Sequence, residues 1–204
     1  EDAGALVPVA VPIAEDLADV WERGGTAWIA GGSGGLLEAT SAGVTERIGL
    51  PGVPLEAIAV AGDGTLFVAG GAGRVFAGAA GTLAEVPSGT LSAIRDVWPL
   101  PSSGVLAAGD NGVVLSCSRT ACTRVNEDPA SFLYGIGGST GSAVLAVGWA
   151  GTVLRRAADG TFAPLASGTF RVLRAVDGRD GGSHFIVGRD GTFLEYRATS
   201  EVAP

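Results

Sequence analysis

One pattern recurs five times along the chain at an almost constant spacing. In each copy a short apolar run ends in a glycine, and a second glycine follows three residues later. The five pairs are Gly31/Gly34, Gly70/Gly73, Gly109/Gly112, Gly148/Gly151 and Gly188/Gly191. Successive first glycines lie 39, 39, 39 and 40 residues apart. A period near 40 residues, with about four short strands per unit, is typical of a β-propeller. We therefore predict an all-β fold with five blades.

Aligning the copies defines a unit of four strands, which we letter a to d. Strand a is an apolar run with the shape L-x-A-V, such as Leu133–Ile136, and strand b ends at the first glycine. Strand c follows the second glycine, and strand d is a short apolar run after that. We expect four-stranded antiparallel blades in a single domain over residues 1–204. The repeats cover about 17–53, 54–90, 91–129, 130–169 and 170–204.

The fifth repeat has no strand d of its own, because the chain ends soon after its strand c. The N-terminal segment around residues 6–11 has the composition of a strand d, and Val9 aligns with Val86, Val125 and Leu165 of the other repeats. We therefore predict that strand 6–11 completes the last blade and closes the ring. Such pairing would remove the unpaired sheet edges of an open array.

The repeated glycines have a physical reason. The turn between strands b and c needs a residue at positive φ, which glycine adopts without steric cost. The first glycine ends strand b where the blades are expected to crowd together, so that a side chain would clash. We therefore expect Gly148→Val to lower stability more than a surface substitution does.

Cys117 and Cys122 are the two cysteines of the chain, and four residues separate them. In a short hairpin loop they would face each other across the strands, close enough for a disulfide. Two free thiols, or half of a metal site, are the alternatives, and we assign no metal because the single histidine, His184, lies in another repeat. A disulfide favours the periplasm or the cell exterior. Residue 1 is not methionine, so a removed N-terminal segment could carry a lipid anchor.

Composition excludes several classes of function. The net charge of −8 disfavours a surface that neutralises phosphates, so we expect no nucleic-acid partner. The most apolar run, residues 5–14, is interrupted by Pro8 and Pro12 and is too short to insert in a membrane. The glycine pairs lie between two strands with no helix start to receive an anion, so no phosphate loop is expected. We predict no cofactor.

The repeat V-L-A-V-G-W-A-G-T-V-L-R-R-A-A-D-G-T-F, which starts at Val144, resembles those of photosystem II stability/assembly-factor-like propellers, which are related to BNR (sialidase-type) repeats. It is also similar to the A-V-G-x-x-G-T-I-L-type repeats of large bacterial secreted proteins. Further matching pieces are Ser-Gly-Thr at 88–90 and 167–169, and Asp-Val-Trp at 19–21 and 96–98. The resemblance covers almost the whole chain and implies a fold, not an activity.

Catalysis finds little support in the residues. A nucleophilic triad would have to be built around His184, which we expect to be exposed or packed against a loop. A glycosidase needs two converging carboxylates. Asp110 and Asp190 could share one face, but each is also a common turn residue.

Binding is the better supported theme. Trp149 is predicted at the tip of a b–c turn, where an aromatic ring has no evident folding role and can anchor a partner or a sugar ring. Packing over the neighbouring blade is the alternative. The same turn position holds Arg189 and Asp190 one blade on, and Asp110 and Asn111 one blade before. We take these five residues as the candidate site.

The sequence thus predicts a non-enzymatic binding or scaffolding module, periplasmic or extracellular, that engages a protein or a surface glycan on its b–c face. The alternative is a glycoside-active enzyme with carboxylates at the channel mouth. A lectin with one sugar pocket per blade is a third hypothesis, but the five turns differ in their exposed residues.

Overall fold

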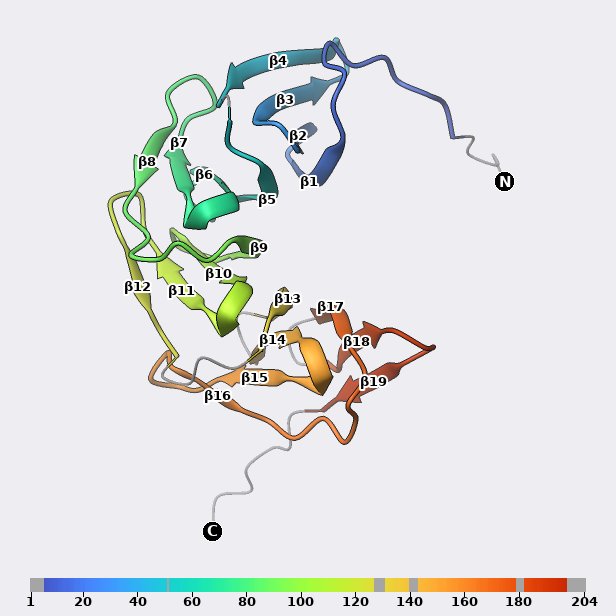
Figure 1. Cartoon of the computed structure of the whole chain (residues 1–204). Helices are drawn as coiled ribbons and strands as arrows, with labels where there is room; N and C mark the ends of the chain where they lie inside the picture. Colours follow the sequence, from blue (N-terminus) through green and yellow to red (C-terminus); the bar gives the residue numbers. More distant parts are fainter. Residues whose placement is uncertain (1–5, 51, 127–130, 140–142, 179–181, 198–204) are drawn as a thin grey trace.

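The computed structural model describes residues 6–50, 52–126, 131–139, 143–178 and 182–197. These residues form five antiparallel sheets arranged in an arc around a common centre (Figure 1). Innermost strands of neighbouring blades contact one another, and each chain segment completes one sheet before it enters the next. The prediction of an all-β fold with five blades is confirmed.

Four blades have four strands and the fifth has three. Blade 1 holds β1 (Leu17–Arg23), β2 (Thr26–Gly31), β3 (Gly35–Thr40) and β4 (Gly43–Gly49). Blade 2 holds β5 (Leu55–Val60), β6 (Leu66–Gly70), β7 (Val75–Gly78) and β8 (Ala84–Val86). Blade 3 holds β9 (Ile94–Pro99), β10 (Val105–Gly109), β11 (Val114–Cys117) and β12 (Cys122–Arg124). Blade 4 holds β13 (Leu133–Ser139), β14 (Ala143–Gly148), β15 (Val153–Arg156) and β16 (Phe162–Pro164), and blade 5 holds β17 (Leu173–Gly178), β18 (His184–Gly188) and β19 (Phe193–Tyr196).

The predicted closure by residues 6–11 is not formed in this structure. These residues contain no strand, Leu6, Val7 and Val9 are exposed, and β19 pairs with β18 alone in its sheet. Blades 1 and 5 do not lie side by side, and the N-terminal segment runs away from blade 1 on the far side of the gap between them (Figure 1). The fifth blade therefore has three described strands instead of four, and closure by residues 6–11 stays a prediction.

The first glycine of each pair is explained by a backbone contact. At Gly148 an added Cβ would lie 2.0 Å from the carbonyl oxygen of Phe132, and at Gly109 it would lie 2.1 Å from that of Ala93. The same carbonyls accept hydrogen bonds from the N–H groups of the next residues, Trp149 (2.8 Å) and Asp110 (2.9 Å). Strand b thus ends against the residue that precedes strand a of its own blade.

The second glycine lies in a tight turn with positive φ. In blades 2 to 4 this turn is a short 3₁₀ segment: η1 (Gly71–Gly73), η2 (Asp110–Gly112) and η3 (Trp149–Gly151). The middle residue also has positive φ, as at Asn111 (56°) and Ala150 (52°), followed by Gly112 (64°) and Gly151 (75°). Two successive left-handed residues match the twist of a two-residue hairpin.

The hydrogen bonds above place the b–c turns and the linkers between blades on the same face of the ring. We call it the turn face. The opposite face carries the a–b and c–d loops, including the loop closed by the predicted disulfide. Cys117 and Cys122 are bonded, with their Cα atoms 4.0 Å apart, where β11 pairs with β12. This prediction is confirmed.

Aspartates and tryptophans of the innermost strands make contacts between blades. Asp19 accepts a hydrogen bond from the N–H of Ile58 in blade 2 (2.9 Å), and Asp96 accepts one from Ile136 in blade 4 (2.8 Å). Trp21 and Trp98 meet edge to face, with ring centroids 6.2 Å apart, although they belong to blades 1 and 3. These side chains connect blades that the backbone ladders do not.

Candidate functional site

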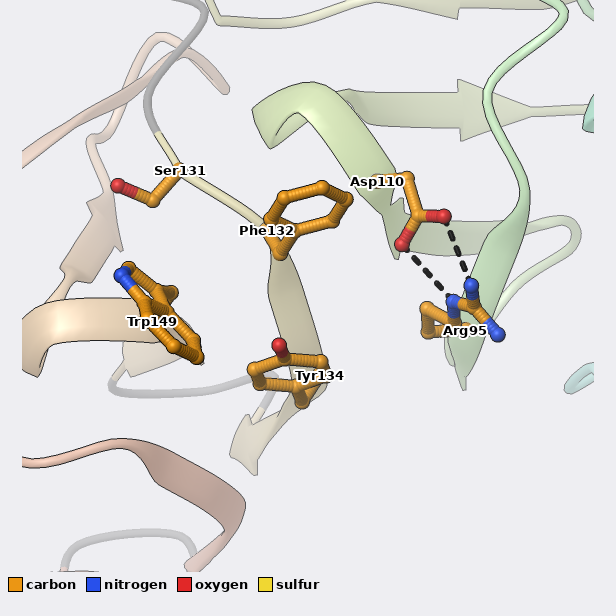
Figure 2. A pocket seen from close by; sticks show the side chains of 6 residues that line it. All are labelled: Arg95, Asp110, Ser131, Phe132, Tyr134 and Trp149. Carbon is orange, nitrogen blue, oxygen red and sulfur yellow. Dashed lines mark hydrogen bonds and ion pairs between the residues drawn. The ribbon is translucent and has the colours of Figure 1, made fainter.

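A cavity of about 390 Å³ opens on the turn face between blades 3 and 4. The lining residues shown in Figure 2 come from β9, η2, the linker before β13, β13 itself and η3. They are Arg95, Asp110, Ser131, Phe132, Tyr134 and Trp149. Two of the five predicted site residues, Trp149 and Asp110, therefore lie in one cavity.

Trp149 and Phe132 make the apolar part of the cavity. Trp149 is 48 % exposed and Phe132 is 45 % exposed, and the ring of Phe132 lies between Trp149 and Asp110 (Figure 2). The backbone N–H of Trp149 donates to the backbone carbonyl of Phe132, which fixes the turn against the linker. Two half-exposed aromatic rings, on segments joined by this hydrogen bond, are thus available to a ligand.

The polar wall of the cavity is an ion-pair network across two blades. Arg95 donates to both carboxylate oxygens of Asp110 (2.8 and 2.7 Å) and to Glu56 of blade 2 (2.6 and 2.7 Å). The hydrogen bonds to Asp110 are the main reason that the pKa of Arg95 is raised. Bidentate guanidinium–carboxylate pairs of this kind are geometrically specific, so Asp110 has a fixed position in the wall.

An equivalent position on each innermost strand contributes to this region. The second residue of the strand is Ala18, Glu56, Arg95, Tyr134 or Arg174 in blades 1 to 5. The guanidinium of Arg174 lies 4.7 Å from the ring centroid of Tyr134, a cation–π contact between blades 5 and 4. The repeat position therefore places a different side chain on the innermost strand of each blade. Arg95, Phe132 and Tyr134 were missed by sequence reasoning, although for Arg95 and Tyr134 this variable repeat position was a readable signal.

The other three predicted site residues lie on the same face but outside the cavity. The Asn111 side chain donates to Ser92 (3.0 Å), and Asp190 pairs with Arg171. Arg189 is exposed at the turn of blade 5 and has no ion pair among the described residues. Their role in a site stays a prediction.

His184 differs from its expected place. It is fully buried at the start of β18, with Nε2 2.9 Å from the carbonyl oxygen of Ala143 in blade 4, and its ring contacts Tyr196 edge to face. The prediction of an exposed or loop-packed histidine is therefore wrong. Within the described residues no group of three His, Cys, Asp or Glu side chains could hold a metal ion.

Fold and cavity together define the class: a β-propeller with an aromatic cavity on its turn face. A scan of protein-family models finds no match, and no curated protein matches the chain. Solved structures do. The chain resembles "YCF48 bound to D1 peptide" with a TM-score of 0.72 and 12% identity, over 97% of this chain and 68% of that one.

Two other propellers are similar to the same degree. One is a catalytically inactive virginiamycin B lyase from Staphylococcus aureus with quinupristin (TM-score 0.70, 13% identity, 92% of this chain and 72% of that chain). The other is the WD40 β-propeller domain of Doa1 (TM-score 0.72, 9% identity, 89% of this chain and 63% of that chain). Identities this low carry the fold alone. The resemblance to assembly-factor-like propellers is confirmed at that level.

Proposed function

We propose that this propeller is a non-enzymatic binding module that engages a protein partner on its turn face. The observation that carries the proposal is the cavity between blades 3 and 4, where Phe132 and Trp149 are half exposed and their segments are joined by a backbone hydrogen bond. Aromatic side chains of this kind supply much of the binding energy in protein interfaces. The similarity to a propeller bound to a peptide supports the same class of partner.

The carboxylates on this face support binding rather than glycoside cleavage. Both oxygens of Asp110 accept hydrogen bonds from Arg95, and Asp190 pairs with Arg171. A glycosidase needs one carboxylic acid and one free carboxylate flanking the scissile bond. Neither aspartate is free for that role here. A surface glycan stacked on Trp149 is the second candidate ligand, because the exposed indole offers an apolar face.

The proposed location is the periplasm or the cell exterior. The Cys117–Cys122 disulfide supports it, since such bonds persist in oxidising compartments. Among the described residues no helix is long and apolar enough to cross a membrane.

A binding comparison tests the proposed function. The full chain is panned against a phage-displayed library of random 12-residue peptides and, in parallel, incubated with a glycan array whose products are checked for cleavage. We expect peptides to be retained, with the affinity of an enriched peptide about tenfold lower for Trp149→Ala, since a buried aromatic anchor contributes more than about 1 kcal/mol. Retention of glycans alone would favour the second candidate, and cleavage would refute a binding module.

Phe185→Ala is the matched control. This aromatic residue is also 45 % exposed, but it lies in β18 at the end of the strand away from the turn face. Its replacement should leave peptide affinity unchanged. Equal losses for Trp149→Ala and Phe185→Ala would remove the cavity as the site.

A further inference from the structure

Two linkers on the turn face present a large apolar side chain to solvent. Leu91, in the linker before β9, is 87 % exposed, and Phe170, in the linker before β17, is 92 % exposed. Both follow the tripeptide Ser-Gly-Thr, at residues 88–90 and 167–169. Such side chains gain free energy when a partner covers them, so that they can act as anchors for that partner.

We call the exposed side chains of Leu91 and Phe170 the two tips. The two linkers make the same hydrogen bonds around their tips. Ser88 Oγ donates to the Thr90 carbonyl (3.3 Å) and Ser92 N–H donates to Thr90 Oγ1 (3.0 Å). In the second linker Ser167 Oγ donates to the Thr169 carbonyl (3.2 Å) and Arg171 N–H donates to Thr169 Oγ1 (3.1 Å). Side-chain turns of this type fix a loop locally. Each exposed tip is therefore built on an ordered turn.

The b–c turns pack against these linkers as well. An added Cβ at Gly73 would lie 2.3 Å from the Thr90 carbonyl oxygen, and one at Gly151 would lie 1.9 Å from that of Thr169. The second glycine of the repeat thus lets the turn approach the linker closely. Gly151 lies in η3 together with Trp149, and it packs against Thr169, the residue before Phe170. The linker that carries Phe170 therefore packs directly against the turn that carries Trp149.

Leu91 and Phe170 stand on either side of the aromatic cavity. Leu91 lies in the linker before blade 3, and blade 3 supplies Arg95 and Asp110 to the cavity. Phe170 lies in the linker between blade 4, to which Trp149 belongs, and blade 5. Sheets packed face to face are about 10 Å apart, so two blade steps cover roughly 20 Å, the length of about six extended residues. A single sugar ring is too short to reach both tips.

Most guanidinium groups on this face are paired within the protein, but two near blades 4 and 5 are not. Arg74 pairs with Glu85, Arg95 with Glu56 and Asp110, and Arg171 with Asp190. Arg174 and Arg189 have no ion pair among the described residues. The carboxylates of Glu15 and Asp16 on this face lie in the linker before β1, at the other end of the arc. The guanidinium groups of Arg174 and Arg189 are therefore complementary, locally, to a carboxylate of a partner.

We propose that Leu91 and Phe170 are two further anchors for the partner, which is an extended polypeptide segment with spaced apolar side chains and at least one carboxylate. The central apolar side chain enters the cavity, and the outer ones rest on the two tips. A carboxylate faces Arg189. The inference rests on the proposed function, since it names the partner of the same face.

The test uses the enriched peptide of the panning experiment, synthesised with a fluorescein label, and fluorescence anisotropy with the full chain. Leu91→Ser and Phe170→Ser should each weaken binding about tenfold, because each removes one buried apolar contact. Phe185→Ser, at an exposed position off the turn face, is the matched control and should bind as wild type. Trimming the peptide to four residues should abolish binding, since it no longer spans the tips.

A separate experiment tests the contact between Arg189 and a carboxylate of the peptide. The dissociation constant should rise severalfold between 50 and 500 mM NaCl for wild type, and less for Arg189→Ala. Arg119→Ala is its control, because Arg119 is an exposed cation in the c–d loop of the opposite face. An unchanged salt dependence in Arg189→Ala would refute the carboxylate contact.

The outcomes separate the two proposals. If Trp149→Ala weakens binding while Leu91→Ser and Phe170→Ser stay within twofold of wild type, the anchors are refuted and the cavity stands. If none of the three weakens binding, or if panning enriches no peptide, both proposals fail. Circular dichroism of each variant confirms that it is folded, as expected for substitutions at exposed linker positions.

Discussion

Phe67 and Phe185 occupy the same position of the repeat, three residues before the first glycine, yet their surroundings differ completely. Phe67 in β6 is fully buried within the cluster shared by blades 2 and 3, whereas Phe185 in β18 is 45 % exposed. The outer face of blade 5 is not covered by a sixth sheet in Figure 1. The comparison shows that a repeat defines the shape of a blade, while its neighbour decides how much that blade contributes to stability.

The contrast extends along both blades. Every residue of β6 is buried, but β18 alternates, with Phe185 and Val187 exposed. Phe185 stacks on Phe193 of β19, with ring centroids 5.6 Å apart, so two apolar rings of one sheet face cover only each other. In both blades strand b is paired on both of its edges, β6 with β5 and β7 and β18 with β17 and β19. The difference lies in packing between sheets, not in hydrogen bonding within them.

The largest expected effect tests this contrast directly. Phe67→Ala should lower the free energy of unfolding by about 4 kcal/mol, the usual cost of deleting a buried phenyl ring. Phe185→Ala should cost less than about 1 kcal/mol, because little burial is lost. Urea unfolding followed by tryptophan fluorescence measures both. Similar losses for the two variants would mean that the outer face of blade 5 is covered in solution.

A second pair of substitutions, at Gly148 in blade 4 and Gly188 in blade 5, should show no difference between the blades. Gly148 and Gly188 each face a carbonyl oxygen of their own blade, at 2.0 Å (Phe132) and 2.4 Å (Val172) from an added Cβ. Because no neighbouring blade takes part, Gly148→Val and Gly188→Val should cost about the same, roughly 3 kcal/mol. Thermal unfolding gives the comparison. A much milder effect of Gly188→Val would show that the linker of blade 5 moves aside.

Sequence reasoning could predict what one repeat contains. The b–c turns, the ends of strand b at Gly109 and Gly148, and the disulfide all depend on residues close together in the chain. The candidate site was found in part for the same reason, since Trp149 and Asp110 lie at equivalent turn positions. These features follow from local geometry and were confirmed by the structure, whereas the binding role of the site stays a proposal.

What the sequence could not predict depends on contacts between repeats. Arg95 reaches Glu56, 39 residues away, and His184 reaches the Ala143 carbonyl, 41 residues away. The surroundings of a side chain at one repeat position depend on which residue the next blade has opposite it.

The disulfide offers a smaller test within a covered blade. Replacing both Cys117 and Cys122 by serine should lower the free energy of unfolding by about 2 kcal/mol, the chain-entropy contribution of so short a loop. The comparison is wild type with and without reductant, with the double serine variant as a control that should not respond. A loss well above this value would indicate that the c–d hairpin of blade 3 also packs differently without the bond.

The carboxylates that join blades give the smallest effect and depend on pH. Asp96 accepts a hydrogen bond from the backbone N–H of Val97 in its own blade and one from that of Ile136, which connects blades 3 and 4. Blade 4 has Gly135 at the equivalent position, which has no side chain to make such a bond to blade 5. Burial raises the pKa of Asp96 to about 7, and the nearby charge of Asp19 acts in the same direction. The carboxyl group is therefore more easily kept neutral in the folded chain than in the unfolded one.

The sign of the pH dependence follows from that pKa. A carboxyl whose folded pKa is above its unfolded value binds more protons in the native state, so its contribution is complete below about pH 4 and is lost as pH rises through about 7. Wild type should thus be less stable at pH 8 than at pH 5.5, by on the order of 1 kcal/mol. Asp96→Asn should lose most of this difference in urea unfolding, although it also loses one accepted hydrogen bond at both pH values. An equal pH dependence in wild type and Asp96→Asn would mean that Asp96 is ionised at both pH values. Its hydrogen bond to Ile136 would then be exposed to solvent.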